Sequence, residues 1–281
     1  MRSVIRGTGM YVPPQVVDNH RLARVMDTSH EWILQRTGIV KRHFAPPGVA
    51  TSDLAVPAAR AAIEDSGLSV HDIDYIVFAT MTPDFYFPGA APYFQRKIGI
   101  HHVPCLDIRQ QCAGFIYGLQ LTDALIRARQ FRNVLLIGAE EHGCFMPWKC
   151  WDVVIDGVER EVTDEEIAWS TQFRDRAVLF GDGAGALVVS GEEGEPGERG
   201  VIDFLLYTDG ELAEKLHAPA GGSAFRPYFT EEMIRAGATV PIVEGREVYK
   251  LAVKLMPEVV EQLLERNGST VDQLDLLIMH Q

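Results

Sequence analysis

Basic charge, cysteine and long apolar runs are all scarce in this chain of 281 residues. Its 26 lysines and arginines against 39 acidic residues give a net charge of −13, which argues against a nucleic-acid-binding surface. No apolar run approaches the roughly 20 residues that a membrane span needs. The four cysteines form no CxxC pair, and no signal peptide precedes Val4, so we expect reduced thiols in a cytoplasmic protein.

The chain does have material for a large core, because 47% of its residues are hydrophobic. Its apolar segments alternate between strand and helix patterns, which is typical of an α/β protein. The strands are expected over residues 3–9, 75–79, 103–108, 134–138, 177–180 and 184–189. The helices are expected over residues 19–26, 31–35, 54–65, 88–98, 113–129 and 247–266. Residues 145–175 follow neither pattern.

One cysteine stands at an abrupt change of pattern. Cys112 lies between the strand expected over 103–108 and the helix expected over 113–129, and the small residues Ala113 and Gly114 follow it. The unpaired N–H groups at a helix N-terminus stabilise a thiolate, and small neighbours let a carbonyl group approach it. Cys112 is therefore a candidate nucleophile for acyl transfer. The alternative is that Cys112 is a small buried apolar residue.

An internal repeat indicates a duplicated architecture. When the chain is shifted by 201 residues, residues 57–80 align without a gap on residues 258–281. Both segments have the order helix, glycine stop, turn and apolar strand. The identical positions are Glu64, Gly67, Val70 and Asp74, which align with Glu265, Gly268, Val271 and Asp275. We predict two related α/β halves, residues 1–190 and 191–281, joined by a hinge over 191–200, with their sheets packed in a layered core.

The second predicted half is incomplete when it is compared with the first. Further strands and a long helix follow residues 75–79, whereas the second half ends at the matching strand, 276–281. An open strand edge and a bare apolar face are unfavourable in water. We therefore expect the sequence to be a C-terminally truncated version of a longer protein.

Five segments, in order along the chain, resemble the β-ketoacyl-[acyl-carrier-protein] synthase III family of the thiolase superfamily. They are Glu31-Trp32-Ile33 with Arg36-Thr37-Gly38-Ile39, Thr82-Pro83-Asp84 with Phe87-Pro88, Asp107-Ile108 with Cys112-Ala113-Gly114-Phe115, Phe180-Gly181-Asp182-Gly183-Ala184-Gly185-Ala186, and Met279-His280-Gln281. The resemblance covers essentially the whole chain. It implies a thiolase-like fold with duplicated α/β halves in an α-β-α-β-α core, which agrees with the internal repeat.

The resemblance implies a reaction in two stages and no cofactor or metal. Cys112 matches the family's nucleophile, which takes an acyl group from acyl-CoA as a thioester. Malonyl-[acyl-carrier-protein] then loses carbon dioxide, and its carbanion attacks that thioester. His280 matches the histidine that stabilises the enolate. The family's asparagine and glycine-rich C-terminal stretch have no counterpart before Gln281, so we expect acylation to survive more readily than condensation.

The resemblance also implies a binding site for acyl-CoA. Trp32 and Arg36 match residues that hold the adenine and the phosphate groups of CoA, by stacking and by charge-assisted hydrogen bonds. Thr28 is expected to add a contact. A further arginine is expected from either Arg174 or Arg176, because the irregular stretch before them leaves the alignment open. Each of these residues could instead be an ordinary surface residue.

Other positions match residues that meet partners in the family. Phe87 matches an acyl-pocket residue near a dimer interface, so a homodimer is expected, although a plain core role would also suit a phenylalanine beside a proline. Lys250 and Lys254 lie one turn apart on the helix expected over 247–266 and could face an acidic carrier protein. The alternative for these two lysines is a solvated helix face.

Two further features of the sequence bear on its function. The spacing Gly181-x-Gly183-x-Gly185 suggests a phosphate loop, but it lies within a strand pattern and opens no helix, so we reject nucleotide binding there. Gln110-Gln111 and the long segment 145–175 depart from the family pattern. They leave open a related condensing enzyme, such as a polyketide starter synthase, a head-to-head condensing enzyme or a relative of 3-hydroxy-3-methylglutaryl-CoA synthase. A non-catalytic remnant that binds acyl-CoA is the alternative outside the enzymes.

Overall fold

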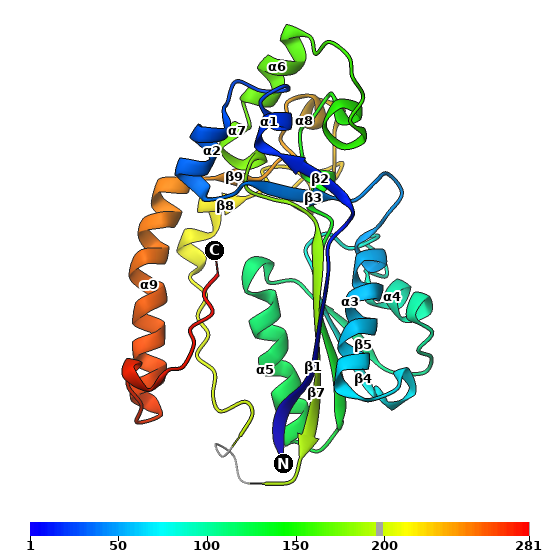
Figure 1. Ribbon diagram of the computed structural model, residues 1–281, viewed down its shortest axis with the longest axis vertical. Coiled ribbons are helices and arrows are strands. Elements are labelled where there is room, and N and C mark those ends of the chain that lie inside the picture. The colour runs from blue at the N-terminus through cyan, green and yellow to red at the C-terminus, as the bar shows by residue number, and fades with distance from the viewer. Residues whose placement is uncertain (195–198, 281) are drawn as a thin grey trace. The chain divides into compact units, whose positions relative to one another are not determined.

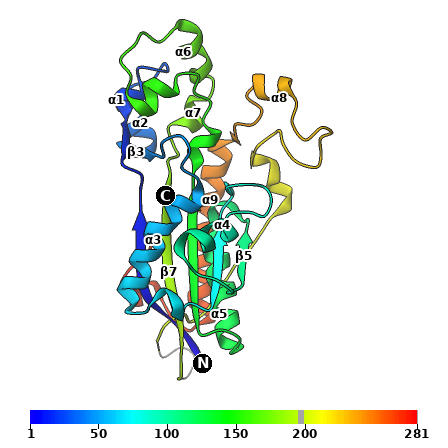
Figure 2. The ribbon, with the colours of Figure 1, turned by 90° about the vertical axis from the view of Figure 1, so that its right-hand side faces the viewer.

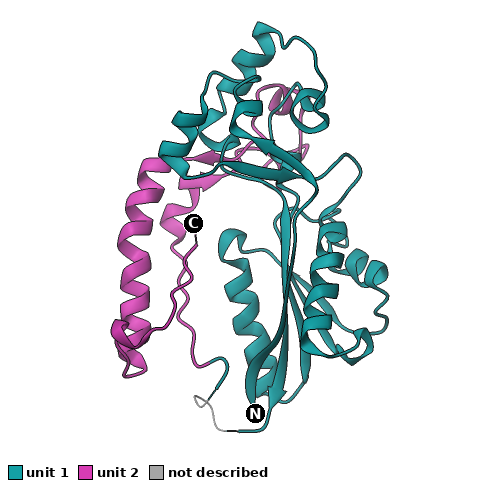
Figure 3. Ribbon diagram, viewed as in Figure 1, with its two compact units in different colours: residues 1–201 teal, residues 202–281 magenta. Residues whose placement is uncertain are grey.

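The computed structural model of the chain describes residues 1–194 and 199–280. These residues form two compact units, Met1–Val201 and Ile202–Gln281 (Figure 3). The hinge predicted over residues 191–200 and the motif Met279-His280-Gln281 lie partly outside the described residues.

A five-stranded mixed sheet forms the centre of unit 1, in the order β1-β7-β6-β4-β5 (Figure 1). Strands β4, β5 and β6 run parallel, and β7 pairs antiparallel with both β1 and β6. Because β4 lies between two strands and under helices, its last four residues are buried, as its continuous apolar run predicts. The strands are β1 (Arg2–Tyr11), β4 (Tyr75–Ala79), β5 (Cys105–Ile108), β6 (Asn133–Glu140) and β7 (Gly183–Glu192).

Helices cover both faces of this sheet (Figures 1 and 2). Helix α3 (Thr51–Ser66) packs on one face with α4 (Ala91–Ile98) beside it, and α5 (Gly114–Arg127) packs on the opposite face. Alternate residues of β4 serve the two sides, because Ile76 and Phe78 lie in the core under α3, whereas Val77 lies in the core under α5. Unit 1 is therefore an α-β-α sandwich.

Helix α3 approaches strand β1 more closely than side chains allow. A Cβ atom added to Gly7 would lie 2.2 Å from the Ala62 carbonyl oxygen, and one added to Gly9 would lie 2.1 Å from the Ala58 carbonyl oxygen. The alanines of α3 and the glycines of β1 thus bring two backbones into direct contact.

A smaller subdomain of unit 1, which we call the cap, lies at one end of the sheet (Figures 1 and 2). It has its own buried apolar cluster, which includes Ile33, Trp148 and Val153. Residues 145–175, which fitted no pattern, belong here and contribute a short π-helix and α6. The cap consists of β2 (Gln15–Asp18), α1 (Asn19–Leu22), α2 (His30–Thr37), β3 (Lys41–Phe44), the π-helix Asp152–Asp156, α6 (Asp164–Thr171) and α7 (Arg174–Ala177).

The strand predicted over residues 177–180 is wrong. Ala177 ends helix α7, Val178 is the C-cap of that helix, and both are buried in the cap. The apolar run therefore reflects burial in the cap and not a place in a sheet. Strand β7 begins later, at Gly183.

Unit 2 is dominated by one long helix, α9 (Gly245–Arg266). Its other elements are short: a 3₁₀ turn Gly210–Lys215, β8 (Leu216–His217), α8 (Glu231–Arg235) and β9 (Ile242–Val243). Strands β8 and β9 pair antiparallel with each other.

The predicted repeat recurs in the backbone up to its last element. Gly67 follows α3 and Gly268 follows α9, with left-handed φ values of +72° and +65°. The 3₁₀ turns Val70–Asp72 and Val271–Gln273 then come at positions 201 residues apart. These are the helix, glycine stop and turn that the aligned sequences predict.

The strand predicted at the end of the repeat is wrong. Residues 276–280 are irregular, and Leu276 and Ile278 are 74% and 85% exposed. The matching strand β4 is hydrogen-bonded on both sides, to β5 and to β6. Among the described residues no strand pairs with 276–280, so the apolar run has no sheet to join.

Candidate active site

Cys112 lies at the junction between a strand and a helix, as the sequence predicts. Strand β5 ends at Ile108, one 3₁₀ turn covers Gln111–Ala113, and α5 begins at Gly114. Gln111 has a φ of +44°, a left-handed conformation that residues other than glycine adopt at some cost in free energy. The turn leaves Cys112 exposed to solvent, where a substrate could reach the sulfur.

The electrostatic environment of Cys112 differs from the prediction of a stabilised thiolate. Although Cys112 as a whole residue is exposed, the protein atoms around the thiol group partly desolvate it, and this desolvation raises its pKa. A backbone hydrogen bond lowers the pKa, and the nearby Glu140 carboxylate raises it further. Desolvation therefore outweighs the backbone hydrogen bond. These surroundings favour the protonated thiol.

Glu140, at the carboxyl end of β6, holds the loop that follows β4. Its two carboxylate oxygens accept hydrogen bonds from the Met81 N–H group (2.8 Å), from the Thr82 N–H group (3.1 Å) and from the Thr82 hydroxyl (2.5 Å). Burial raises the pKa of this carboxyl group. The sequence analysis missed Glu140, although an acidic residue directly after a buried strand is a signal for the carboxyl edge of a parallel sheet.

Asp107, which belongs to the cysteine motif, caps helix α4. Its carboxylate accepts hydrogen bonds from the Ala90 N–H group at 2.8 Å and from the Ala91 N–H group at 3.1 Å. A Cβ atom on Gly89, whose φ is +107°, would lie 2.7 Å from an Asp107 carboxylate oxygen. Asp107 thus fixes the segment that follows Phe87, whose side chain is 90% exposed.

In the cap, the structure brings together most of the residues predicted to bind CoA. The guanidinium carbons of Arg36 and Arg174 lie 4.3 Å and 4.6 Å from the centroid of the Trp32 ring. Arg174 also donates a hydrogen bond to the Asp27 carbonyl oxygen, next to Thr28. The Thr28 hydroxyl oxygen is buried and has no hydrogen-bond partner among the described residues. We call Thr28, Trp32, Arg36 and Arg174 the tryptophan–arginine cluster.

Of the two arginines that the sequence left open, Arg174 joins this cluster and Arg176 does not. The Arg176 guanidinium lies 5.2 Å from the centroid of the Phe173 ring and pairs with Asp175 at 3.2 Å. The two residues lie two positions apart on the short helix α7, and so they point to different neighbours.

The remaining predicted residues lie in unit 2. His280 is exposed and lies on the irregular segment, so its predicted place at the end of a strand is wrong. Lys250 and Lys254 are exposed on α9. Lys250 pairs with Glu247 at 2.9 Å, one turn earlier on the same helix, so part of its charge is already balanced.

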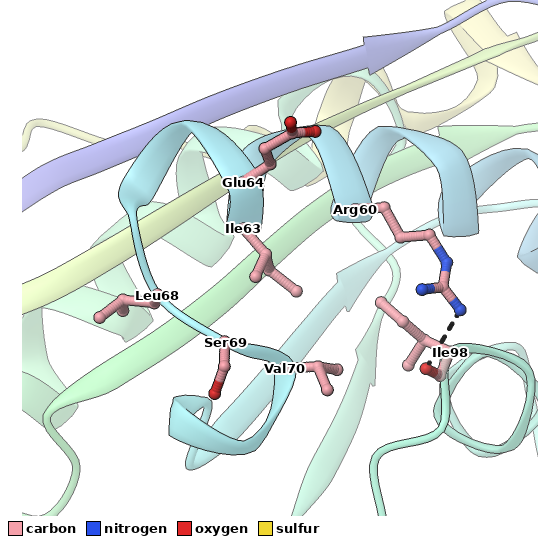
Figure 4. Close-up of a pocket in the computed structure, with 7 residues that line it drawn as sticks. All are labelled: Arg60, Ile63, Glu64, Leu68, Ser69, Val70 and Ile98. Carbon is pink, nitrogen blue, oxygen red and sulfur yellow. Dashed lines mark hydrogen bonds between the residues drawn. The ribbon is translucent and has the colours of Figure 1, made fainter.

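Elsewhere in the described residues there are few signs of another site. No group of three or more potential metal ligands occurs in residues 1–194 and 199–280, and no helix there is long and apolar enough to cross a membrane. Figure 4 shows a shallow depression between α3 and α4, where Arg60 donates a hydrogen bond to the Ile98 carbonyl oxygen at 3.5 Å. No cysteine or histidine lines it.

The comparisons place this chain, with its exposed cysteine in a turn beside a mixed α/β sheet, in the class of thiolase-like acyltransferases. A family model described as 3-oxoacyl-[acyl-carrier-protein (ACP)] synthase III matches residues 106–155. The chain belongs to the β-ketoacyl-[acyl-carrier-protein] synthase III family. The thiolase-like α/β fold predicted from the sequence is thereby confirmed.

The relatives set the extent of this similarity. The chain is 39% identical to the β-ketoacyl-[acyl-carrier-protein] synthase III of Caldanaerobacter subterraneus subsp. tengcongensis over 277 residues, which cover 99% of this chain and 75% of the relative. The crystal structure of the Aquifex aeolicus synthase III is 33% identical, with a TM-score of 0.75, and the match covers 98% of this chain and 75% of that one. The Pseudomonas aeruginosa synthase III is 30% identical with a TM-score of 0.78, covering 98% and 74%.

Proposed function

We propose that this chain is a 3-oxoacyl-[acyl-carrier-protein] synthase III of fatty acid biosynthesis, with Cys112 as its nucleophile. The single observation that carries the proposal is the exposed cysteine in the strained turn between β5 and α5. The tryptophan–arginine cluster supports acyl-CoA as the donor, because an indole ring can stack on adenine and two guanidinium groups can bind phosphates.

In the first stage, the Cys112 sulfur attacks the carbonyl carbon of acyl-CoA. A new C–S bond forms, the C–S bond to CoA breaks, and CoA leaves as a thiolate that takes up the proton of the Cys112 thiol. Since the raised pKa of Cys112 favours the thiol, this proton must be transferred during the reaction. No cofactor takes part in the proposed chemistry.

In the second stage, malonyl-[acyl-carrier-protein] loses carbon dioxide, and the resulting enolate attacks the Cys112 thioester. A C–C bond forms between the enolate carbon and the acyl carbonyl carbon, the C–S bond to Cys112 breaks, and Cys112 leaves as a thiolate that takes up a proton. We propose that His280 donates a hydrogen bond to the thioester oxygen of the enolate, and that Lys250 and Lys254 face the acidic carrier protein. The His280→Ala variant should still become acylated but form no 3-oxoacyl product, which a radiolabelled condensation assay measures.

The first stage is tested by intact-protein mass spectrometry after incubation with a panel of acyl-CoAs. We expect one acyl adduct on the wild-type chain and none on Cys112→Ala. Cys144→Ala is the matched control, because Cys144 is the other exposed free thiol and the surroundings of Cys144 raise its pKa. An adduct that persists in Cys112→Ala, or a folded wild-type chain that no acyl-CoA modifies, would refute the proposed nucleophile.

We also propose that the protein is a homodimer that pairs through the edge of the sheet at β5. Within the part of the chain that the structure describes, strand β5 pairs on one side only, with β4, and Leu106 on it is 40% exposed. A run of exposed aromatic residues precedes α4 in the sequence: Phe85, Tyr86 and Phe87, which are 58%, 57% and 90% exposed. Such a run is typical of a protein–protein interface. Sedimentation equilibrium should show a dimer that Phe87→Asp weakens; a monomeric wild-type chain at micromolar concentration would contradict it.

We also propose a cytoplasmic location. Cys105, Cys112, Cys144 and Cys150 are all free, which supports a reducing environment such as the cytoplasm.

A further inference from the structure

Arg42, on β3, is a buried cation that forms no salt bridge among the described residues, and Asp18 is the carboxylate whose charge acts on it. The residue is 5% exposed, and among the described residues its guanidinium bonds only to neutral acceptors. These acceptors are the Val17 carbonyl oxygen at 3.3 Å, the Asn19 side-chain oxygen at 2.8 Å and the Val178 carbonyl oxygen at 2.9 Å. Burial lowers the pKa of Arg42 to about 10. Burying a charge of this kind costs free energy unless hydrogen bonds or opposite charges compensate it.

Asn19, one of the hydrogen-bond acceptors of Arg42, connects Arg42 to helix α2. The Asn19 amide group donates a hydrogen bond to the Ile39 carbonyl oxygen at 2.8 Å and lies 3.4 Å from the His30 ring nitrogen Nδ1. His30 is the first residue of α2, and Ile39 lies two residues beyond its end. Asn19 therefore holds α2 at both ends, and α2 carries Trp32 and Arg36.

Val178, another acceptor of Arg42, connects Arg42 to helix α7. Val178 is the C-cap residue of α7, and its carbonyl oxygen is one of the groups that a helix C-terminus leaves without a partner. The Arg42 guanidinium satisfies this group at 2.9 Å. Helix α7 begins with Arg174, the arginine that contacts the Trp32 ring.

We propose that Arg42 is a positioning residue that sets Arg174 against Trp32 and so forms the binding site for the nucleotide end of the acyl-CoA donor. One rigid guanidinium bridges Asn19, which holds α2, and the end of α7. A lysine keeps the charge, but its single ammonium group cannot reach acceptors in three directions with the same planar geometry. This role rests on the proposed function, since it assigns the cluster to the CoA nucleotide.

The test compares two donors that carry the same acyl group, acyl-CoA and acyl-pantetheine, which has the thioester but lacks the nucleotide. In Arg42→Lys and in Asn19→Ala, we expect the second-order rate constant for Cys112 acylation by acyl-CoA to fall at least about tenfold, because misplacement by about 1 Å can cost up to about 100-fold. The rate constant with acyl-pantetheine should stay within about twofold, since this donor makes no use of the cluster.

Two control variants set the scale. Arg174→Ala should reproduce the selective loss with acyl-CoA. Arg24→Lys should change neither rate constant, because Arg24 is an exposed cap arginine paired with the exposed Glu159. Circular dichroism confirms that each variant is folded at the assay temperature. Equal losses with both donors, or no loss with acyl-CoA, in both Arg42→Lys and Asn19→Ala would overturn the positioning role and leave the proposed function intact.

If neither donor acylates the wild-type chain, calorimetric titration with CoA tests the positioning role of Arg42 instead. In that case the proposed function has failed, and the positioning role stands only if the wild-type chain binds CoA and Arg42→Lys weakens this binding at least about tenfold. A wild-type chain that does not bind CoA would overturn both.

Discussion

Gly9→Ala is expected to lower the free energy of unfolding of unit 1 by at least about 3 kcal/mol, the upper range for overpacking a core. The added Cβ atom would lie 2.1 Å from the Ala58 carbonyl oxygen and 2.5 Å from the Ala62 backbone nitrogen. Both are backbone atoms of α3, which cannot turn away as a flexible side chain could. Strand β1 or helix α3 would have to move, and the apolar core beneath α3 would loosen. Urea unfolding followed by circular dichroism measures the effect.

Gly185→Ala is the matched control for this prediction. Gly185 lies on β7, opposite Met10 of β1, and a Cβ atom there would have nothing within 4 Å. We expect its stability to stay unchanged or to rise by up to about 1 kcal/mol, since alanine loses less backbone entropy on folding than glycine. If Gly9→Ala and Gly185→Ala differed by less than about 1 kcal/mol, the proposed backbone contact between β1 and α3 would be contradicted.

Glu141→Gln is expected to change how stability depends on pH. Burial of Glu141, together with the neighbouring Asp182 charge, raises its pKa from 4.5 to about 7. Because the folded chain binds this proton more tightly than the unfolded chain, wild-type stability falls as the pH rises from about 4.5 to about 7, by up to about 3 kcal/mol from this residue. Above about pH 7 both states are ionised and the effect is constant. The glutamine variant lacks this fall.

The experiment compares the free energies of unfolding of wild type and Glu141→Gln in urea at several pH values between 5 and 8. The stability of the variant relative to the wild type should rise between pH 5 and about pH 7 and stay constant above about pH 7. Taking the difference matters, because burial also raises the pKa values of Glu140, Asp107 and Asp182. Glu159→Gln, at a side chain that is 82% exposed, is the control. Parallel curves for wild type and Glu141→Gln would show that Glu141 is ionised in the folded chain at pH 5.

Much of the fold could be predicted from the sequence because its signals are local. The apolar run Tyr75–Ala79 forms β4 without any change of bounds, and Cys112 lies at the predicted junction of strand and helix. The run 177–180 wrongly predicts a strand, because residues buried in the cap and residues buried in a sheet show the same apolar sequence pattern. Length and composition alone cannot separate these two environments.

The site was harder to predict than the fold, since its properties depend on neighbours distant in sequence. The thiolate expected at Cys112 ignored the carboxylate of Glu140 and the desolvation of the thiol. The choice between Arg174 and Arg176 depended on which one α7 turns toward Trp32. No sequence pattern singles out Arg42, because its proposed role depends on its contacts with Asn19 and Val178. The roles of Cys112 and His280 in catalysis stay predictions.

The repeat separates two kinds of information within one sequence. In unit 1, the helix, the left-handed glycine and the 3₁₀ turn lie against a sheet, whereas α9 in unit 2 has no buried residue, yet the same three features recur there. Only the final strand differs. The helix, the glycine stop and the turn are thus determined by the local sequence of the repeat, whereas a strand forms only where other strands pair with it. A duplicated gene segment can copy the first kind of instruction intact, but the second must be supplied anew by whatever strands come to lie beside it.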